Sequence, residues 1–352
     1  MTAPHPIAGP CAWLGGEMAN SPRWIRTLDA AAVAAIDAAL PRVRELDWRA
    51  VTRESFPLTG LKPLFADIAE ELENGSGMVK LRGLPVSRYS PEDLRRLWFG
   101  IGCHVGTPVF QNRRGELMRD IRDEGADNAA ERYGEVRKEG DGGRFLSSYA
   151  RTLTSGPLRF HTDRCDVVGL LCVRQAGKGG LSRLSSSPAV HNAMLKRRPE
   201  LAALLYREVW RSRFGEEAEK NTAVYPLPVW GVREGKFTSH YSLTYIEAAE
   251  MAPGTPKLSG EQREAISLQM DLAGELSFDM TLEPGDMQLL NNHVIYHART
   301  AFEDDAAAGR DRLLYRLWLT VPNSRALPLG HEVLWRSVAA GAPRGGIGQY
   351  TI

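Results

Sequence analysis

The sequence predicts an α+β, mainly β protein whose core is a double-stranded β-helix, a jelly-roll of the cupin-like type, with flanking and inserted helices. The first observation is a series of short apolar runs bounded by glycine and proline, which is typical of strands. The second is that these runs form an early and a late group, with helix-like stretches between them. Strands that begin, are interrupted and then resume indicate one jelly-roll that carries insertions.

Residues 1–77 are predicted to form an N-terminal arm and helices that pack on the core. The first 25 residues are rich in proline and glycine, which indicates an irregular arm. An alanine-rich run from Thr27 predicts a helix that Pro41 ends. A second helix is predicted to begin at Thr59, whose hydroxyl can cap it, and to end at Gly75.

Residues 78–352 are predicted to form the double-stranded β-helix domain. It begins with a strand-like run over residues 78–86, followed by a helix that Ser90 caps. Residues 112–156 then form the most polar long stretch of the chain, with several glycines at its centre. A polar stretch of this length is usually a functional loop or is disordered, and we expect a lid that closes over a site.

The remaining elements alternate between strand-like and helix-like runs. A helical insertion is predicted over residues 188–275, where AVHNAMLKRRPELAALLY and SGEQREAISLQMDLAGEL have helical character. The expected strands are PLRFHTD, VVGLLCVRQ and LSRLSSS before the insertion, and SFDMTLEPGD, MQLLNNHVIYH and RLLYRLWLTV after it.

The composition excludes several classes of protein. With 352 residues, 43% hydrophobic and 25% charged, the chain is long and apolar enough for a packed core. Its net charge of +1 argues against nucleic acid as a partner, and it has no apolar stretch long enough to span a membrane. Four scattered cysteines without a CxxC pair, and a start without a secretory pattern, predict a cytoplasmic protein. The partner is expected to be a small-molecule substrate, and a homo-oligomer is compatible with the sequence.

Common catalytic signatures are absent from the sequence. It contains no GxxxxGK[ST], HExxH or GxSxG motif, and no GxGxxG after a strand. Phosphate loops, zinc-protease helices, hydrolase elbows and dinucleotide turns are therefore not expected.

His161 and Asp163 lie two positions apart on a strand-like run, so both side chains point to one face. A third candidate ligand, His297, follows the Pro-Gly-Asp turn of the late strand group. Two neutral imidazoles and one carboxylate are the facial ligand set of oxygen-activating Fe(II) enzymes, and they leave three positions open. The pattern predicts that these three residues bind Fe(II), with two open positions for 2-oxoglutarate and one for O2.

Arg312 and Arg316 lie four positions apart on the last strand-like run and therefore share a face. An arginine forms paired hydrogen bonds with a carboxylate. Both are predicted to line the 2-oxoglutarate site, and the sequence leaves open which of them binds the distal carboxylate.

These motifs resemble the taurine dioxygenase (TauD/TfdA) family of Fe(II)- and 2-oxoglutarate-dependent dioxygenases, with a clavaminate synthase-like fold. The resemblance covers roughly residues 78–321. It implies that His161, Asp163 and His297 are the iron ligands and that Ser182 contacts the co-substrate carboxylate. It also implies that Arg312 is the 2-oxoglutarate arginine and Arg316 a second arginine of the pocket. The segments that carry it are FHTD, GGLS, LEPGD, NNHVIYHARTAFED and RLLYR.

The sequence departs from this family at two positions near the expected iron. His293 stands where related sequences often have arginine, and Ser182 replaces a threonine. The substrate therefore does not follow from the resemblance. Halogenating relatives lack the carboxylate ligand, so Asp163 favours hydroxylation over halogenation.

Four further residues are candidates for contact with the substrate. Arg159 would share the inward face of its strand with His161. His293 and Asn292 precede the third ligand, and Tyr241 belongs to an aromatic set in the insertion.

The function predicted from the sequence is oxidation, most simply hydroxylation, of a C–H bond in a small organic substrate, with release of succinate and CO2. The same three ligands could instead bind Zn²⁺ or Mn²⁺ and activate water in a hydrolase or lyase. A catalytically silent, cupin-like binding protein is a third alternative.

Overall fold

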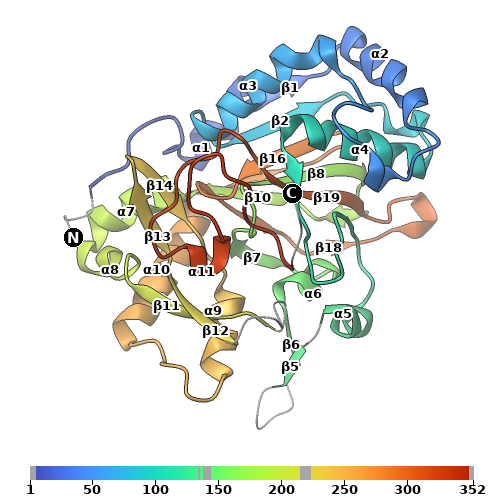
Figure 1. Cartoon of the computed structure of the whole chain (residues 1–352). Helices are drawn as coiled ribbons and strands as arrows, with labels where there is room; N and C mark the ends of the chain where they lie inside the picture. The colour runs from blue at the N-terminus through green and yellow to red at the C-terminus, as the bar shows by residue number, and fades with distance from the viewer. Residues whose placement is uncertain (1–4, 134, 138–143, 215–222, 349–352) are drawn as a thin grey trace.

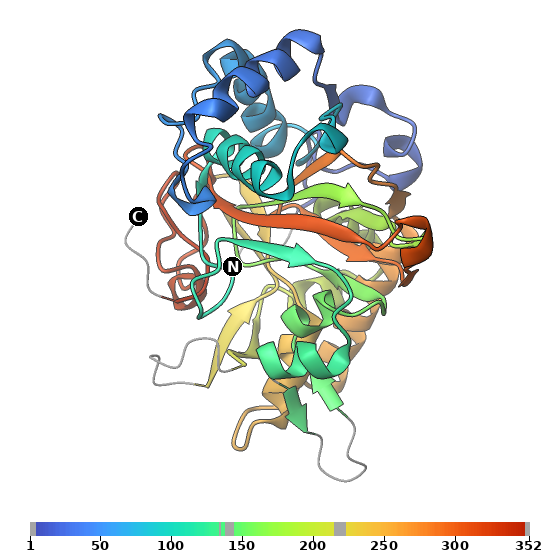
Figure 2. The ribbon, with the colours of Figure 1, turned by 90° about the vertical axis from the view of Figure 1, so that its right-hand side faces the viewer.

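The computed structural model describes residues 5–133, 135–137, 144–214 and 223–348. Two mainly antiparallel sheets lie at its centre, and helices cover them from two sides (Figures 1 and 2). This confirms a mixed α/β fold with a large β component. No helix among these residues has both the length and the apolar character needed to cross a membrane.

The larger sheet has seven strands, and β1 with β2 is its one parallel pair. It combines early and late runs of the sequence, because β8 lies between β16 and β19. Its strands, in spatial order, are β1 (Ile25–Thr27), β2 (Met78–Arg82), β16 (Met287–Asn291), β8 (Val167–Arg174), β19 (Leu313–Thr320) and β3 (Thr107–Pro108), with β4 (Met118–Ile121) also paired to β19.

The smaller sheet has four strands and again joins early with late segments. MQLLNNHVIYH, predicted as one strand, is split: β16 belongs to the larger sheet and β17 to the smaller one, with the turn at residues 292–294. The chain thus crosses from one sheet to the other next to the candidate ligand His297. The four strands are β15 (Phe278–Met280), β10 (Ser182–Ser186), β17 (Ile295–Arg299) and β7 (Leu158–His161).

The N-terminal helices cover the outer face of the larger sheet, as Figure 2 shows at its top. Ser90 caps the third of them as predicted, because its side chain accepts a hydrogen bond from the backbone N–H of Asp93. The prediction that Thr59 caps the second helix is wrong. A 3₁₀ turn begins at Thr59, and the α-helix starts at Lys62 without a side-chain cap. The helices are α2 (Ala30–Ala39), α3 (Lys62–Glu73) and α4 (Pro91–Val105).

Strand β19 is buried along its whole length and separates two apolar clusters. Leu317 packs in the cluster beneath the N-terminal helices, whereas Trp318 packs in the cluster on the other side of the sheet. The period of two therefore sends neighbouring side chains to opposite faces. It also brings Trp318 to the face where the candidate ligands lie.

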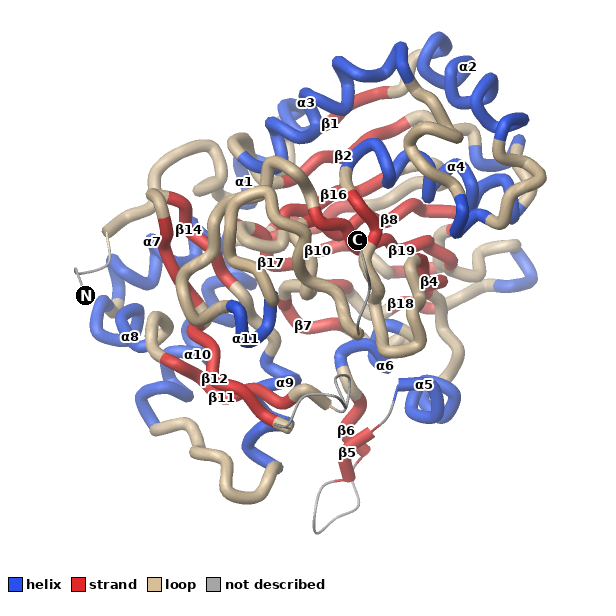
Figure 3. Tube along the Cα trace, in the orientation of Figure 1, coloured by secondary structure: helices blue, strands red, loops and turns tan. Residues whose placement is uncertain are grey.

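The insertion over residues 188–275 is not purely helical, which corrects the prediction. Its helices occur where expected, but two hairpins and a further helix lie between them (Figure 3). The turn of the second hairpin has positive φ at Glu234 and Gly235, as a type I′ turn requires at both central positions. The elements are α7 (Ser187–Arg197), α8 (Pro199–Leu204), β11 (Glu208–Ser212), β12 (Val224–Pro228), β13 (Trp230–Arg233), β14 (Lys236–Ser239), α9 (Leu243–Met251) and α10 (Gly260–Glu275).

The polar stretch 112–156 contains more regular structure than a simple loop. Strand β4 adds to the larger sheet, and a short helix brings Ser148 and Tyr149 toward the sheets. Residues 134 and 138–143 lie outside the described residues. The elements here are α5 (Ala126–Tyr133), β5 (Glu135–Arg137), β6 (Arg144–Leu146) and α6 (Ser148–Thr152). Other short helices and strands outside this stretch are α1 (Gly15–Met18), β9 (Lys178–Gly179), β18 (Phe302–Glu303) and α11 (Glu332–Trp335).

Candidate metal centre and its cavities

Side chains from distant parts of the sequence meet between the two sheets. His161 ends β7 and lies opposite His297 of β17 in the register of the smaller sheet. Asp163 follows the end of β7 and reaches the same point from a loop, although the sequence predicted it on the strand. One ligand atom from each of the three residues lies within 4.8 Å of the other two. The carboxylate oxygens of Asp163 are 3.9 Å from His161 Nε2 and 3.7 Å from His297 Nε2.

The Asp163 carboxylate is held in place by groups from distant segments. Trp318 Nε1 donates a hydrogen bond of 2.9 Å to Oδ2, and Arg316 Nη1 lies 3.9 Å from the same oxygen. The backbone N–H of Asp163 donates to Asn292 Oδ1 at 2.9 Å. Sequence reasoning missed the role of Trp318, since a strand pattern shows the face of a residue but not its partner.

The protonation states suit metal binding. Burial lowers the pKa of both histidines, that of His297 to about 3, so both imidazoles are neutral near pH 7. His161 Nδ1 lies 2.8 Å from the backbone oxygen of Arg159, which assigns the proton to Nδ1 and leaves Nε2 as a ligand. Burial acts to raise the pKa of Asp163, but the charge of Arg316 and the nearby imidazoles hold it below its usual value. The centre therefore offers two neutral imidazoles and one carboxylate.

A cavity on one side of this centre is rich in arginine. Arg299, Arg312 and Arg316 line it together with Ser182 and His297. Among the residues that the structure describes, buried Nη1 of Arg312 and Nη2 of Arg316 have no hydrogen-bond partner. Burial lowers the pKa of Arg312 to about 10, which still leaves it charged at neutral pH. Desolvated cations of this kind are suited to a ligand carboxylate.

Arg316 and Arg299 also have protein partners. Arg316 Nε donates to Gln111 Oε1 at 2.8 Å. Arg299 Nη2 donates to the carbonyl oxygens of Thr154 and Gly156, both at 2.5 Å, and so ties the end of the polar stretch to β17. Sequence reasoning missed Arg299, although it follows His297 by two positions and a strand period places both on one side.

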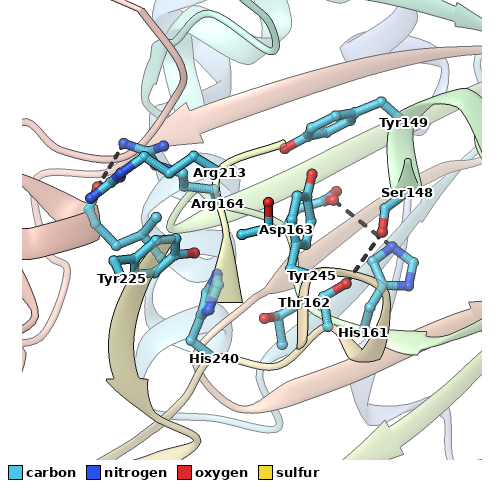
Figure 4. A pocket seen from close by; sticks show the side chains of 13 residues that line it. Ser148, Tyr149, His161, Thr162, Asp163, Arg164, Arg213, Tyr225, His240 and Tyr245 are labelled. Atoms are coloured by element: carbon cyan, nitrogen blue, oxygen red, sulfur yellow. Dashed lines mark hydrogen bonds and ion pairs between the residues drawn. The ribbon is translucent and has the colours of Figure 1, made fainter. Parts of the chain in front are cut away.

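A second cavity is also lined by His161 and Asp163 (Figure 4). Hydroxyl and basic side chains dominate its lining. They come from α6, from residues 162–166 between β7 and β8 (the ligand loop), from the hairpin β11–β12 and from the start of α9. Its polar lining includes Ser148, Tyr149, Arg164, Arg213, His240 and Tyr245.

The four predicted substrate residues lie in different surroundings. Arg159 lines a third cavity beside His161, where it forms an ion pair of 2.6 Å with Glu247. The side chain of Asn292 accepts a hydrogen bond from the backbone N–H of Asp163. His293 Nε2 lies 2.9 Å from Asp166 Oδ1 in a buried polar network. Tyr241 is fully buried and packs in the apolar cluster of the insertion.

Buried histidines predict a loss of stability in acid. His331 is 2% exposed, and neither ring nitrogen has a hydrogen-bond partner among the described residues. Burial lowers its pKa to about 3, whereas an unfolded chain has a histidine pKa of about 6.5. Below about pH 6.5 the native protein binds fewer protons at His331 than the unfolded chain does. The free energy of unfolding therefore includes the full contribution of neutral His331 above about pH 6.5, and this contribution is lost as pH falls toward 3. In urea unfolding at pH 7.5 and 5, we expect His331→Leu to lose less stability than wild type. An equal loss in both proteins would contradict this assignment.

Comparison with known protein families gives a match over most of the chain. The family described as "Taurine catabolism dioxygenase TauD, TfdA family" matches residues 42–318. FR-33289 synthase of Streptomyces rubellomurinus is 31% identical over 350 residues, covering 96% of this chain and 97% of that protein. Taurine hydroxylase-like protein SAT17 of Stachybotrys chartarum is 29% identical, covering 92% of this chain and 80% of that protein.

Solved structures of similar fold include two iron oxygenases. Asparagine oxygenase, in complex with Fe(II), 3-hydroxyasparagine and succinate, has a TM-score of 0.61 at 18% identity, with 84% of this chain and 93% of that chain covered. The non-haem iron oxygenase OrfP, in complex with Fe and α-ketoglutaric acid, has a TM-score of 0.59 at 15% identity, with the same shares covered. At these identities the likeness concerns the fold. The family match and the FR-33289 synthase relative show that this chain belongs to the TauD/TfdA family of Fe(II)- and 2-oxoglutarate-dependent dioxygenases.

Proposed function

We propose that His161, Asp163 and His297 hold Fe(II) at the point where the two sheets meet, and that these sheets form a jelly-roll around it. The donor set fits Fe(II), since two neutral imidazoles and an ionised carboxylate converge within 4.8 Å. Family membership favours this metal over the Zn²⁺ or Mn²⁺ of a hydrolase or lyase, because the matched family consists of dioxygenases.

We propose that 2-oxoglutarate binds in the arginine-rich cavity, with its distal carboxylate at Arg312 and with Ser182 as a further contact. The observation that carries this proposal is the pair of buried guanidinium nitrogens of Arg312 and Arg316 that lack partners in the described chain. Buried guanidinium nitrogens without hydrogen-bond acceptors are costly unless a ligand supplies the acceptors. The carboxylates of 2-oxoglutarate would supply them beside the metal ligands.

Bound Fe(II) and 2-oxoglutarate would supply the activation of O2 and the oxidation of a substrate C–H bond, with release of succinate and CO2. The protein's part is positioning. Trp318 and Arg316 hold the Asp163 carboxylate, and the carbonyl of Arg159 fixes the ring of His161. The Asp163 side chain is 6% exposed and those of His161 and His297 are 13% and 12% exposed, so the ligands are largely shielded from water.

The second cavity is the proposed substrate site, because His161 and Asp163, which also border the arginine-rich cavity, line it (Figure 4). Its hydroxyl and basic lining fits a small polar organic molecule, and Arg159, beside His161, faces an adjoining cavity. Solved relatives in fold carry hydroxylated asparagine or arginine, so amino acids are the first candidates.

The stretch 112–156 is proposed to act as a lid, since Ser148 and Tyr149 line this cavity. Free thiols at all four cysteines support a reducing compartment such as the cytoplasm.

The test is oxygen uptake by the anaerobically Fe(II)-loaded protein after addition of air-saturated buffer. We expect uptake that requires 2-oxoglutarate, with one succinate formed for each O2 consumed, and an increase when the right compound is added from a panel of amino acids and other small organic acids. The matched sample contains Zn²⁺ in place of Fe(II) and should consume no O2. Turnover of a panel compound with Zn²⁺ and without 2-oxoglutarate would instead support the hydrolase or lyase alternative.

A further inference from the structure

The loop that carries Asp163 is bonded to the C-terminal segment, residues 322–348. The backbone N–H of Gly346 donates to the carbonyl oxygen of Arg164 at 2.7 Å. Arg164 Nη2 in turn donates to the carbonyl oxygen of Leu334 at 2.7 Å. A Cβ on Gly345 would lie 2.8 Å from the Arg164 carbonyl oxygen, so the two backbones meet closely. The C-terminal segment therefore packs against the ligand loop and holds it through hydrogen bonds.

Arg344 extends from this segment into the interior. It is 1% exposed, and its Nε donates to Asp166 Oδ1 at 2.7 Å. The same carboxylate accepts a hydrogen bond from the hydroxyl of Thr320 at 3.0 Å and lies 2.9 Å from His293 Nε2. Burial acts to raise the pKa of Asp166, but the His293 hydrogen bond and the Arg344 charge hold it below its usual value. The guanidinium thus balances a buried negative charge.

Asn292 connects Asp166 with the candidate ligand Asp163. Its backbone N–H donates to the carbonyl oxygen of Asp166 at 2.9 Å. Its side-chain Oδ1 accepts from the backbone N–H of Asp163 at 2.9 Å, and its Nδ2 donates to Cys165 Sγ at 3.2 Å. A shift of Asp166 would therefore move the loop on which the Asp163 carboxylate is placed.

We propose that Arg344 is a positioning residue of the metal centre and that the C-terminal segment completes this centre through Asp166. The inference rests on the proposed function, because it takes Asp163 as a metal ligand. The family model matches residues 42–318, so Arg344 lies beyond the residues that this model covers. Arg344 contacts neither the metal ligands nor the arginine-rich cavity in the described contacts, and it acts through the loop.

The test is an anaerobic titration of the metal-free protein with Co(II), followed by its d–d absorption band. Loss of a residue that orients a metal ligand typically weakens metal binding by roughly 10- to 100-fold, and we expect this for Arg344→Met. The conservative variant Arg344→Lys should recover part of the affinity because it keeps the charge. The d–d band of Arg344→Met should also shift, since the Asp163 oxygen no longer has a single position.

Arg325→Met is the matched control. Arg325 lies in the same C-terminal segment, is 6% exposed and forms a buried ion pair of 3.1 Å with Glu73. Its loss should lower the urea midpoint of unfolding, while the Co(II) affinity and band remain those of wild type. An equal weakening of Co(II) binding in Arg325→Met would overturn the proposal, because general destabilisation would then explain both variants.

A milder variant covers the case in which Arg344→Met does not fold. Thr320→Val removes one hydrogen bond to Asp166 and leaves the charge pair, so it should weaken Co(II) binding less, with the same band shift. Wild-type affinity in every foldable variant of Arg344 and Thr320 would overturn this inference alone. Wild-type protein that bound Co(II) no better than His297→Ala would overturn the proposed metal site and this inference with it.

Discussion

Alanine at His161, Asp163 or His297 is expected to abolish turnover and to deplete the protein of iron. Two remaining ligands cannot hold Fe(II) against buffer and water, because a facial site depends on all three donors. Iron content after anaerobic loading and gel filtration, together with succinate formation, measures both effects. The three variants should behave alike, since the three side chains converge on one point.

His104→Ala is the matched control for these variants. His104 is a partly buried histidine whose Nε2 lies 2.8 Å from the carbonyl oxygen of Phe56, and it lines a separate cavity. Its replacement should leave iron content and succinate formation close to wild type. If a ligand variant retained near-normal iron and activity, that residue would have to be removed from the ligand set.

Arg312→Ala is expected to weaken 2-oxoglutarate binding by tens to thousands of fold. Removing one partner of a buried, charge-assisted pair costs about 2–5 kcal/mol, and each 1.4 kcal/mol corresponds to about tenfold in affinity. Arg316→Ala should act more on O2 coupling and on metal retention, because Arg316 lies 3.9 Å from the Asp163 carboxylate. Titration of 2-oxoglutarate into each anaerobic Fe(II) protein, followed by the metal-to-ligand absorption band, distinguishes the two roles.

Arg174→Ala provides the control for this pair. Arg174 is a partly exposed arginine at the end of β8, where it pairs with Asp311 at 2.6 Å, and exposed pairs contribute little to stability. Its loss should leave the 2-oxoglutarate midpoint unchanged. A normal midpoint in Arg312→Ala beside a large shift in Arg316→Ala would reverse the assignment, and normal midpoints in both would exclude these arginines as the co-substrate site.

The residues of the site and the strand-rich core could be predicted from the sequence. The local patterns are the HxD spacing, the Pro-Gly-Asp turn before His297 and the two arginines of RLLYR. The structure places the five predicted side chains around one cavity: His161, Asp163, His297, Arg312 and Arg316. Leu317 and Trp318, which are neighbours on the last strand, likewise pack on opposite faces of the sheet, as the strand period of two requires. Local periodicity is sufficient for such predictions because it depends only on backbone geometry.

The partners of those side chains, in contrast, depend on how distant segments pack in the folded protein. The split of one predicted strand between two sheets, the hydrogen bond from Trp318 to Asp163 and the tie of Arg299 to the end of the polar stretch join distant segments. The same holds for Arg344, which reaches Asp166 across 178 positions of the sequence. A strand period indicates the face on which a side chain lies, but the group that satisfies a buried charge there depends on how remote elements pack.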